Sequence, residues 1–105
     1  MEEIMKIDAA KLVHAVNLYT GYKHDPAPSI GRAARNKQFA ESQYAGLKEI
    51  IEKLEGEFYL SKAYQTAEDL STMGKQARKE FNKKFPFLDD QVSEAFSWCY
   101  TFDYK

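Results

Sequence analysis

An apolar stripe at helical spacing runs through two long segments on either side of Gly56. Residues spaced alternately by four and three positions lie on one face of an α-helix. The pattern therefore predicts two long helices, over 30–55 and 61–84, which meet near Gly56 and fold back as an antiparallel hairpin. The stripe consists of Ala40, Tyr44, Leu47, Ile51 and Leu54 in the first helix and Ala63, Ala67, Leu70, Gly74, Ala77 and Phe81 in the second.

A shorter helix is expected before the hairpin. Asp8 is a suitable N-cap for a helix over 9–20, because its carboxylate can accept from the free amides of the first turn. Gly21 follows at the position where a helix-ending glycine is typical. Residues 1–7 are compatible with a backward extension of this helix or with an irregular segment.

Another short helix is expected at the carboxyl end. Pro86 must end the helix before it, since proline lacks an amide proton and clashes with the preceding turn. Asp89 or Asp90 can then cap a last helix that reaches about Phe102. The predicted fold is all-α: a long antiparallel helical hairpin packed with two shorter helices in a small helical bundle.

Length and composition narrow the class of protein. A chain of 105 residues with 44% hydrophobic and 30% charged residues is typical of one globular domain, here residues 1–105, and not of a disordered segment. The formal net charge of −1 gives no overall support to a strongly basic nucleic-acid-binding protein.

The single cysteine, Cys99, bears on the cellular compartment. One cysteine cannot form a disulfide within the chain, which favours a reducing environment. No apolar run is long enough to span a membrane, and the acidic start of the chain differs from a signal peptide. We therefore expect a soluble cytoplasmic protein with no membrane partner, in which Cys99 is a buried and inert thiol.

Basic residues gather at the open end of the predicted hairpin. If the chain reverses near residue 58, Arg32 lies close to Lys84, and Lys37 lies close to Lys79. The amino end of helix 30–55 points to the same place, and its free amides favour anions. This predicts a surface for phosphate-bearing ligands, and the alternative is an ordinary solvated face. The candidate anion-binding residues are Arg32, Arg35, Lys37, Lys75, Arg78, Lys79, Lys83 and Lys84.

The last segment of the chain is unusually aromatic. One amphipathic helix cannot bury all of these rings against a single neighbour, so Phe96 and Phe102 are expected to face the core. Trp98, Tyr100 and Tyr104 are expected nearer the surface and are the candidate partner-binding residues. For Trp98 and Tyr100, burial against the hairpin is an equally good interpretation.

No catalytic or metal-binding signature is present. Glutamates at helical spacing can bind metal or transfer protons, but no histidine accompanies them here. Four-helix nucleotide pyrophosphatases use a paired glutamate motif followed by a Glu-x-x-Asp motif, and the second motif is absent. His14 is expected in or beside the core. The sequence therefore predicts no catalytic residue, no metal ligand and no cofactor.

Two functions remain open from the sequence. The first is a non-enzymatic protein-binding module, an adaptor or an inhibitor, that acts through the aromatic last helix and one charged end of the hairpin. Its partner is another protein or a second copy of the chain. Phage-encoded inhibitors of host defence are similar in scale, a resemblance of style without a shared family motif. The alternative is a binder of nucleic acid or nucleotides at the basic end of the hairpin.

Overall fold

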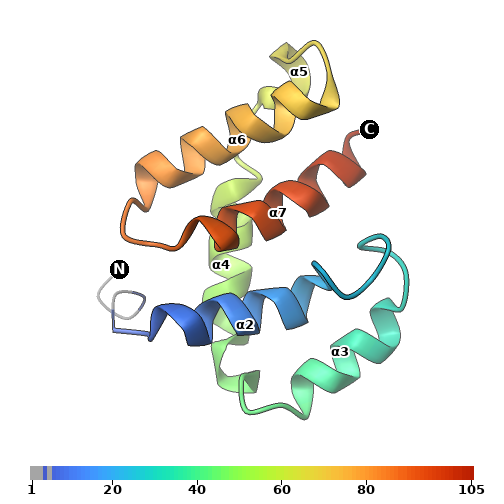
Figure 1. Ribbon diagram of the computed structural model, residues 1–105, viewed down its shortest axis with the longest axis vertical. Helices are drawn as coiled ribbons and strands as arrows, with labels where there is room; N and C mark the ends of the chain where they lie inside the picture. The colour runs from blue at the N-terminus through green and yellow to red at the C-terminus, as the bar shows by residue number, and fades with distance from the viewer. Residues whose placement is uncertain (1–3, 5) are drawn as a thin grey trace.

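The computed structural model describes residue 4 and residues 6–105, and all regular secondary structure within them is helical. The all-α prediction and the small helical bundle are therefore confirmed. Helices α2, α6 and α7 lie side by side with α7 in the middle, and α4 crosses behind them (Figure 1). The elements are α2 (Ala9–Thr20), α3 (Arg32–Ala40), the short 3-10 helix η1 (Ala45–Leu47), α4 (Lys48–Phe58), α5 (Ala63–Thr66), α6 (Leu70–Lys84) and α7 (Asp90–Asp103).

The first predicted helix is confirmed together with its caps. Asp8 accepts a hydrogen bond from the amide of Lys11 at 3.0 Å. Gly21 ends the helix with φ of 83°, a left-handed conformation that glycine adopts without strain. The helix does not extend backwards, since residues 6–8 are not helical, and residues 1–3 and 5 of the open segment lie outside the described residues.

The second predicted helix is interrupted, so its continuity over 30–55 was a wrong prediction. Helix α3 ends at Ala40, and a turn separates it from η1 and α4. Ser42 stabilises the turn, because its hydroxyl donates to the carbonyl of Phe39 at 2.7 Å and accepts from the amide of Tyr44 at 3.1 Å. Serine side chains compete for backbone groups in this way and favour turns over helix interiors. Beyond the break, α4 continues through Gly56 to Phe58.

The third predicted helix is also interrupted. A single turn, α5, ends at Thr66, and Ala67 is extended with φ of −78° and ψ of 142°. Asp69 then caps α6 by accepting from the amide of Thr72 at 2.7 Å. This capping hydrogen bond favours a helix start at Asp69 over a continuous helix through that position. Leu70 of the predicted stripe is exposed.

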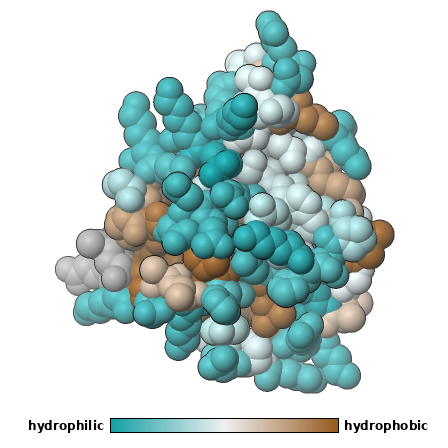
Figure 2. Space-filling model, viewed as in Figure 1, coloured by the Kyte–Doolittle hydropathy of each residue, from teal (hydrophilic) through white to brown (hydrophobic). Residues whose placement is uncertain are grey.

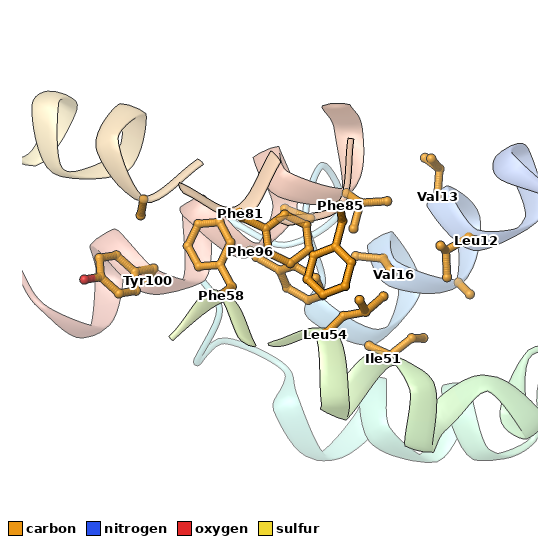
Figure 3. Close-up of a cluster of buried hydrophobic side chains, with 14 of the residues drawn as sticks. Leu12, Val13, Val16, Ile51, Leu54, Phe58, Phe81, Phe85, Phe96 and Tyr100 are labelled. Atoms are coloured by element: carbon orange, nitrogen blue, oxygen red, sulfur yellow. The ribbon is translucent and has the colours of Figure 1, made fainter. Parts of the chain in front are cut away.

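The core is built on aromatic rings from three helices. The ring of Phe58 lies 5.4 Å from that of Phe81 and 6.0 Å from that of Phe96, measured between centroids. Aliphatic side chains of α2 and α4, including Val16 and Leu54, extend this cluster (Figure 3). The expected inward position of Phe96 is confirmed, whereas Phe102 is only half-buried.

Helix α7 packs most closely on α6, and glycine permits this. A Cβ atom at Gly74 would lie 2.7 Å from Oγ of Ser97 and 3.2 Å from Cγ2 of Thr101. The small residue in the stripe therefore lets the second half of α7 approach α6. This packing holds the carboxyl end of α7 beside α5.

Candidate functional site

The predicted basic cluster does not assemble, because the broken helix carries α3 away from α6. Arg35 lies on the inner side of α3 and is 7% exposed. Its guanidinium donates to Asp25 at 2.8 Å, to the carbonyl of Ile30 at 3.1 Å and to that of Tyr19 at 3.1 Å. Arg35 therefore anchors the loop between α2 and α3 and does not offer its charge to a surface ligand.

The predicted approach of Arg32 to Lys84 was wrong. Arg32 lines the same cleft as Glu55 and Gly56, on one side of α4. The ammonium group of Lys84 lies 3.4 Å from the carboxylate of Glu57, on the other side of the same helix. The hairpin geometry that joined the two residues depended on a continuous helix from residue 30.

The other candidate cations remain near the surface. Arg78 is half-buried and lies 3.7 Å from the carboxylate of Glu94. Lys37 is exposed on α3. Helix α6 carries several exposed lysines, and the surface over this helix is largely hydrophilic (Figure 2). These lysines are Lys75, Lys79, Lys83 and Lys84.

The aromatic carboxyl end does form a surface, with partly different members from those predicted. Tyr104 stacks on Tyr64 of α5, with ring centroids 4.3 Å apart and ring planes 10° from parallel. Each of these tyrosines is 40% exposed, and Leu60 in the preceding turn is 64% exposed. We call Leu60, Tyr64 and Tyr104 the tyrosine surface.

Tyr100 supports this surface from below. It is fully buried, which corrects its assignment as a residue that meets a partner. Its hydroxyl donates to the carbonyl of Ser61 at 2.8 Å and accepts from the amide of Tyr64 at 3.2 Å. Its ring centroid lies 4.8 Å from that of Tyr104. Trp98 is half-buried and packs on Tyr22, so it lies apart from the tyrosine surface.

A cleft of about 500 Å³ opens between α2, α3, α4 and α7. We call it the polar cleft, because charged side chains from three of these helices, α3, α4 and α7, line it. Tyr59 connects it to the tyrosine surface, since its ring centroid lies 6.4 Å from that of Tyr104. The lining residues are Tyr19, Thr20, Pro28, Arg32, Arg35, Asn36, Glu52, Glu55, Gly56, Tyr59, Cys99 and Asp103.

Carboxylates crowd one wall of the polar cleft. Burial raises the pKa of Glu55, and the nearby charges of Asp103 and Glu52 raise it further, while Arg32 acts in the opposite direction. The hydroxyl of Tyr59 donates a hydrogen bond to the carboxylate of Asp103 at 2.6 Å. Burial and this hydrogen bond raise the pKa of Tyr59, so its phenol stays neutral.

Cys99 lies at the edge of the same cleft. It is buried as predicted, and burial, with added repulsion from Glu55 and Asp103, raises the pKa of its thiol to about 12. A neutral thiol is a weak nucleophile. By contrast His14, which was expected in or beside the core, is exposed.

Nothing in the sequence indicated the polar cleft. Glu55 and Asp103 are far apart in the chain, and each has the character of an ordinary solvated residue on an amphipathic helix. Within residue 4 and residues 6–105, no group of three or more His, Cys, Asp or Glu side chains is arranged to bind a metal ion. No helix in this part of the chain is both long and apolar enough to cross a membrane.

Comparison of the chain with protein-family models, with curated proteins and with solved structures found no match. Its function must therefore be inferred from the tyrosine surface, the polar cleft and the distribution of charge.

Proposed function

We propose that the protein is a non-enzymatic protein-binding module, whose partner contacts the tyrosine surface. The observation that carries this proposal is the stacked pair Tyr64 and Tyr104, whose rings are 4.3 Å apart while each side chain is 40% exposed. Tyrosine supplies a large and rigid contact area with a polar end, and it is enriched at protein interfaces. An adaptor and an inhibitor would both use such a surface.

The tyrosine surface is held in place before a partner arrives. Tyr100 accepts from the amide of Tyr64 at 3.2 Å, and its buried ring lies beneath Tyr104. The hydroxyl of Tyr64 accepts from the side-chain amide of Gln65 at 2.9 Å. Because these groups are already ordered, binding costs less conformational entropy than it would for free side chains.

The favoured partner is a different protein that presents an apolar anchor flanked by basic side chains. Asp103 adjoins the tyrosine surface and is joined to it through Tyr59. In a symmetric dimer formed around this surface, the carboxylates of the two copies would approach one another. The exposed apolar residues are also few and scattered between hydrophilic ones on the face in Figure 2, which does not suit a large obligate interface.

Photo-crosslinking in cells tests this proposal. A photoreactive phenylalanine analogue replaces Tyr104 in one variant and Phe87 in another, since Phe87 is 41% exposed but follows α6 at its other end. We expect a specific protein to crosslink from position 104 and not from position 87. Crosslinking to a second copy of the chain, or equally from both positions, would contradict the proposal.

The crosslinked protein is then purified and its affinity measured by calorimetry. Truncation of anchor residues at an interface typically weakens binding by a factor of about ten or more. We expect that loss for the double variant Tyr64→Ser and Tyr104→Ser, and wild-type affinity for Phe87→Ser. Wild-type affinity in the double variant would exclude the tyrosine surface as the contact.

The binding of phosphate-bearing ligands is a second candidate function, now restricted to α6. Lys75, Lys79 and Lys83 are exposed and follow each other at intervals of four residues, which places them on one face of the helix. If they contact a single-stranded oligonucleotide, the logarithm of the binding constant should fall with the logarithm of salt concentration with a slope of about −2. No binding at low salt would reject this function.

A further inference from the structure

Oppositely charged side chains line the two sides of the polar cleft without forming an ion pair across it. Arg32 and Asn36 lie on the α3 side, and Glu52 and Glu55 lie on the α4 side. Arg32 forms no ion pair with any carboxylate among the residues that the structure describes. The guanidinium nevertheless acts on Glu55 electrostatically, since it lowers the pKa of this carboxyl against the other influences.

The charges of the polar cleft do not balance. Arg35 is paired with Asp25 at 2.8 Å, so it does not neutralise the opposite wall. Glu52 lies 3.9 Å from the ammonium group of Lys48, in a pair that is exposed on α4. The other two carboxylates of the cleft, Glu55 and Asp103, stand against Arg32 alone, and like charges that are close together disfavour the ionised state. A molecule that brings a cation to the α4 wall would relieve this repulsion, and a carboxylate on the same molecule would suit Arg32.

We propose that the polar cleft binds a small dipolar molecule, a carboxylic acid that also carries guanidinium or ammonium groups, as in a basic amino acid. Its carboxylate pairs with Arg32, and its cationic groups pair with Glu52 and Glu55. A cleft of about 500 Å³ lies within the range of small-molecule sites in proteins. The phenol hydroxyls of Tyr19 and Tyr59 remain neutral, because burial raises the pKa of each, so they add no charge to the cleft.

Nuclear magnetic resonance titration of the full chain with L-arginine tests this site. The backbone amide of Gly56 is a suitable reporter, because Gly56 lines the cleft and follows Glu55 directly in α4. We expect saturable shifts at Gly56 and Tyr59 and none along the lysines of α6. Shifts that do not saturate at millimolar concentration would overturn the proposal.

Two variants separate the two walls. Glu55→Gln should weaken arginine binding by a factor of about ten or more, because a charge-assisted hydrogen bond is lost. Arg32→Gln should weaken arginine binding but leave or improve the binding of 1,4-diaminobutane, which has no carboxylate. Glu49→Gln is the matched control, since Glu49 is exposed on α4 outside the cleft, and it should bind arginine like wild type.

The outcomes decide between a dipolar site and a general affinity for cations. If 1,4-diaminobutane binds as tightly as arginine and Arg32→Gln changes neither, the cleft does not recognise a carboxylate and the proposal fails. It also fails if Glu49→Gln weakens binding as much as Glu55→Gln. The tyrosine-surface variant Tyr64→Ser should retain arginine binding, so this test is independent of the proposed protein partner.

Discussion

The guanidinium of Arg35 lies 2.8 Å from the carboxylate of Asp25, and the pair closes the loop between α2 and α3. The side chain of Arg35 is 8% exposed and also donates to the carbonyl of Pro28 at 2.5 Å. Loop and helix are therefore held by one buried cation, and the position of Arg32 at the polar cleft depends on it.

Loss of Arg35 should destabilise the fold strongly. Arg35→Ala leaves Asp25 and the carbonyls of Tyr19, Pro28 and Ile30 without this partner, and removal of one partner of a buried ion pair typically costs about 3 kcal/mol or more. Urea unfolding measures the effect. Arg32→Ala is the control, because Arg32 is exposed, and it should change the free energy of unfolding by less than about 0.5 kcal/mol. Equal effects of the two substitutions would contradict the described role of Arg35.

Gly74 and Gly56 should respond oppositely to alanine. At Gly74 the added Cβ would lie 2.7 Å from Oγ of Ser97, so α7 must shift or Ser97 must rotate, at a cost of about 1 kcal/mol or more. At Gly56 an added Cβ would meet no heavy atom of the described residues within 4 Å, apart from its chain neighbours and the backbone of its own helix, so alanine should stabilise α4 by up to about 1 kcal/mol. Thermal unfolding of the two variants measures both effects. Addition of Ser97→Ala to Gly74→Ala should restore part of the loss, and no recovery would argue against this contact.

Removal of the buried hydroxyl of Tyr100 should be costly. Tyr100→Phe leaves the carbonyl of Ser61 and the amide of Tyr64 without their partner, and an unsatisfied buried group typically costs about 1–3 kcal/mol. Tyr104→Phe removes an exposed hydroxyl and should leave the free energy of unfolding nearly unchanged. Chemical denaturation compares the two, and equal stability of both variants would show that the Tyr100 hydroxyl has no structural role.

Glu55 should make stability depend on pH. Burial raises its pKa in the folded state, with Asp103 and Glu52 adding to the rise and Arg32 opposing it. The folded protein therefore binds this proton more tightly than the unfolded chain, and the contribution of Glu55 to the free energy of unfolding falls as pH rises from the unfolded to the folded pKa.

Glu55→Gln removes this dependence. The variant should become more stable than wild type as the pH rises from the unfolded to the folded pKa of Glu55, and it should keep this gain at neutral pH. Thermal unfolding at a series of pH values measures the difference. Glu49→Gln, on the exposed side of α4, should show no comparable change with pH. A variant that is less stable than wild type at neutral pH would contradict the crowding of carboxylates in the polar cleft.

Local signals in the sequence were sufficient for the first and last helices. Asp8 and Gly21 mark the ends of α2, and Asp89 accepts from the amide of Gln91 at 2.9 Å at the start of α7. Each of these residues caps a helix through contacts with residues close to it in the sequence, so the helix end can be predicted without the rest of the fold.

The breaks in the two long helices were missed for a different reason. The apolar stripe continues through Ser42 and Asp69, and helical periodicity alone does not report that each side chain bonds to nearby backbone groups instead of extending the helix. The sequence therefore predicted a basic cluster that does not form. It also could not show that Tyr64 and Tyr104 stack, because that contact depends on the break that separates α5 from α6.

The role of the tyrosine surface is tested most directly by the affinity of the purified crosslinking partner for the double variant Tyr64→Ser and Tyr104→Ser, measured by calorimetry beside wild type and Phe87→Ser. We predict a loss of about tenfold or more in the double variant alone. Equal affinities for all three proteins would show that the stacked tyrosines are not the contact.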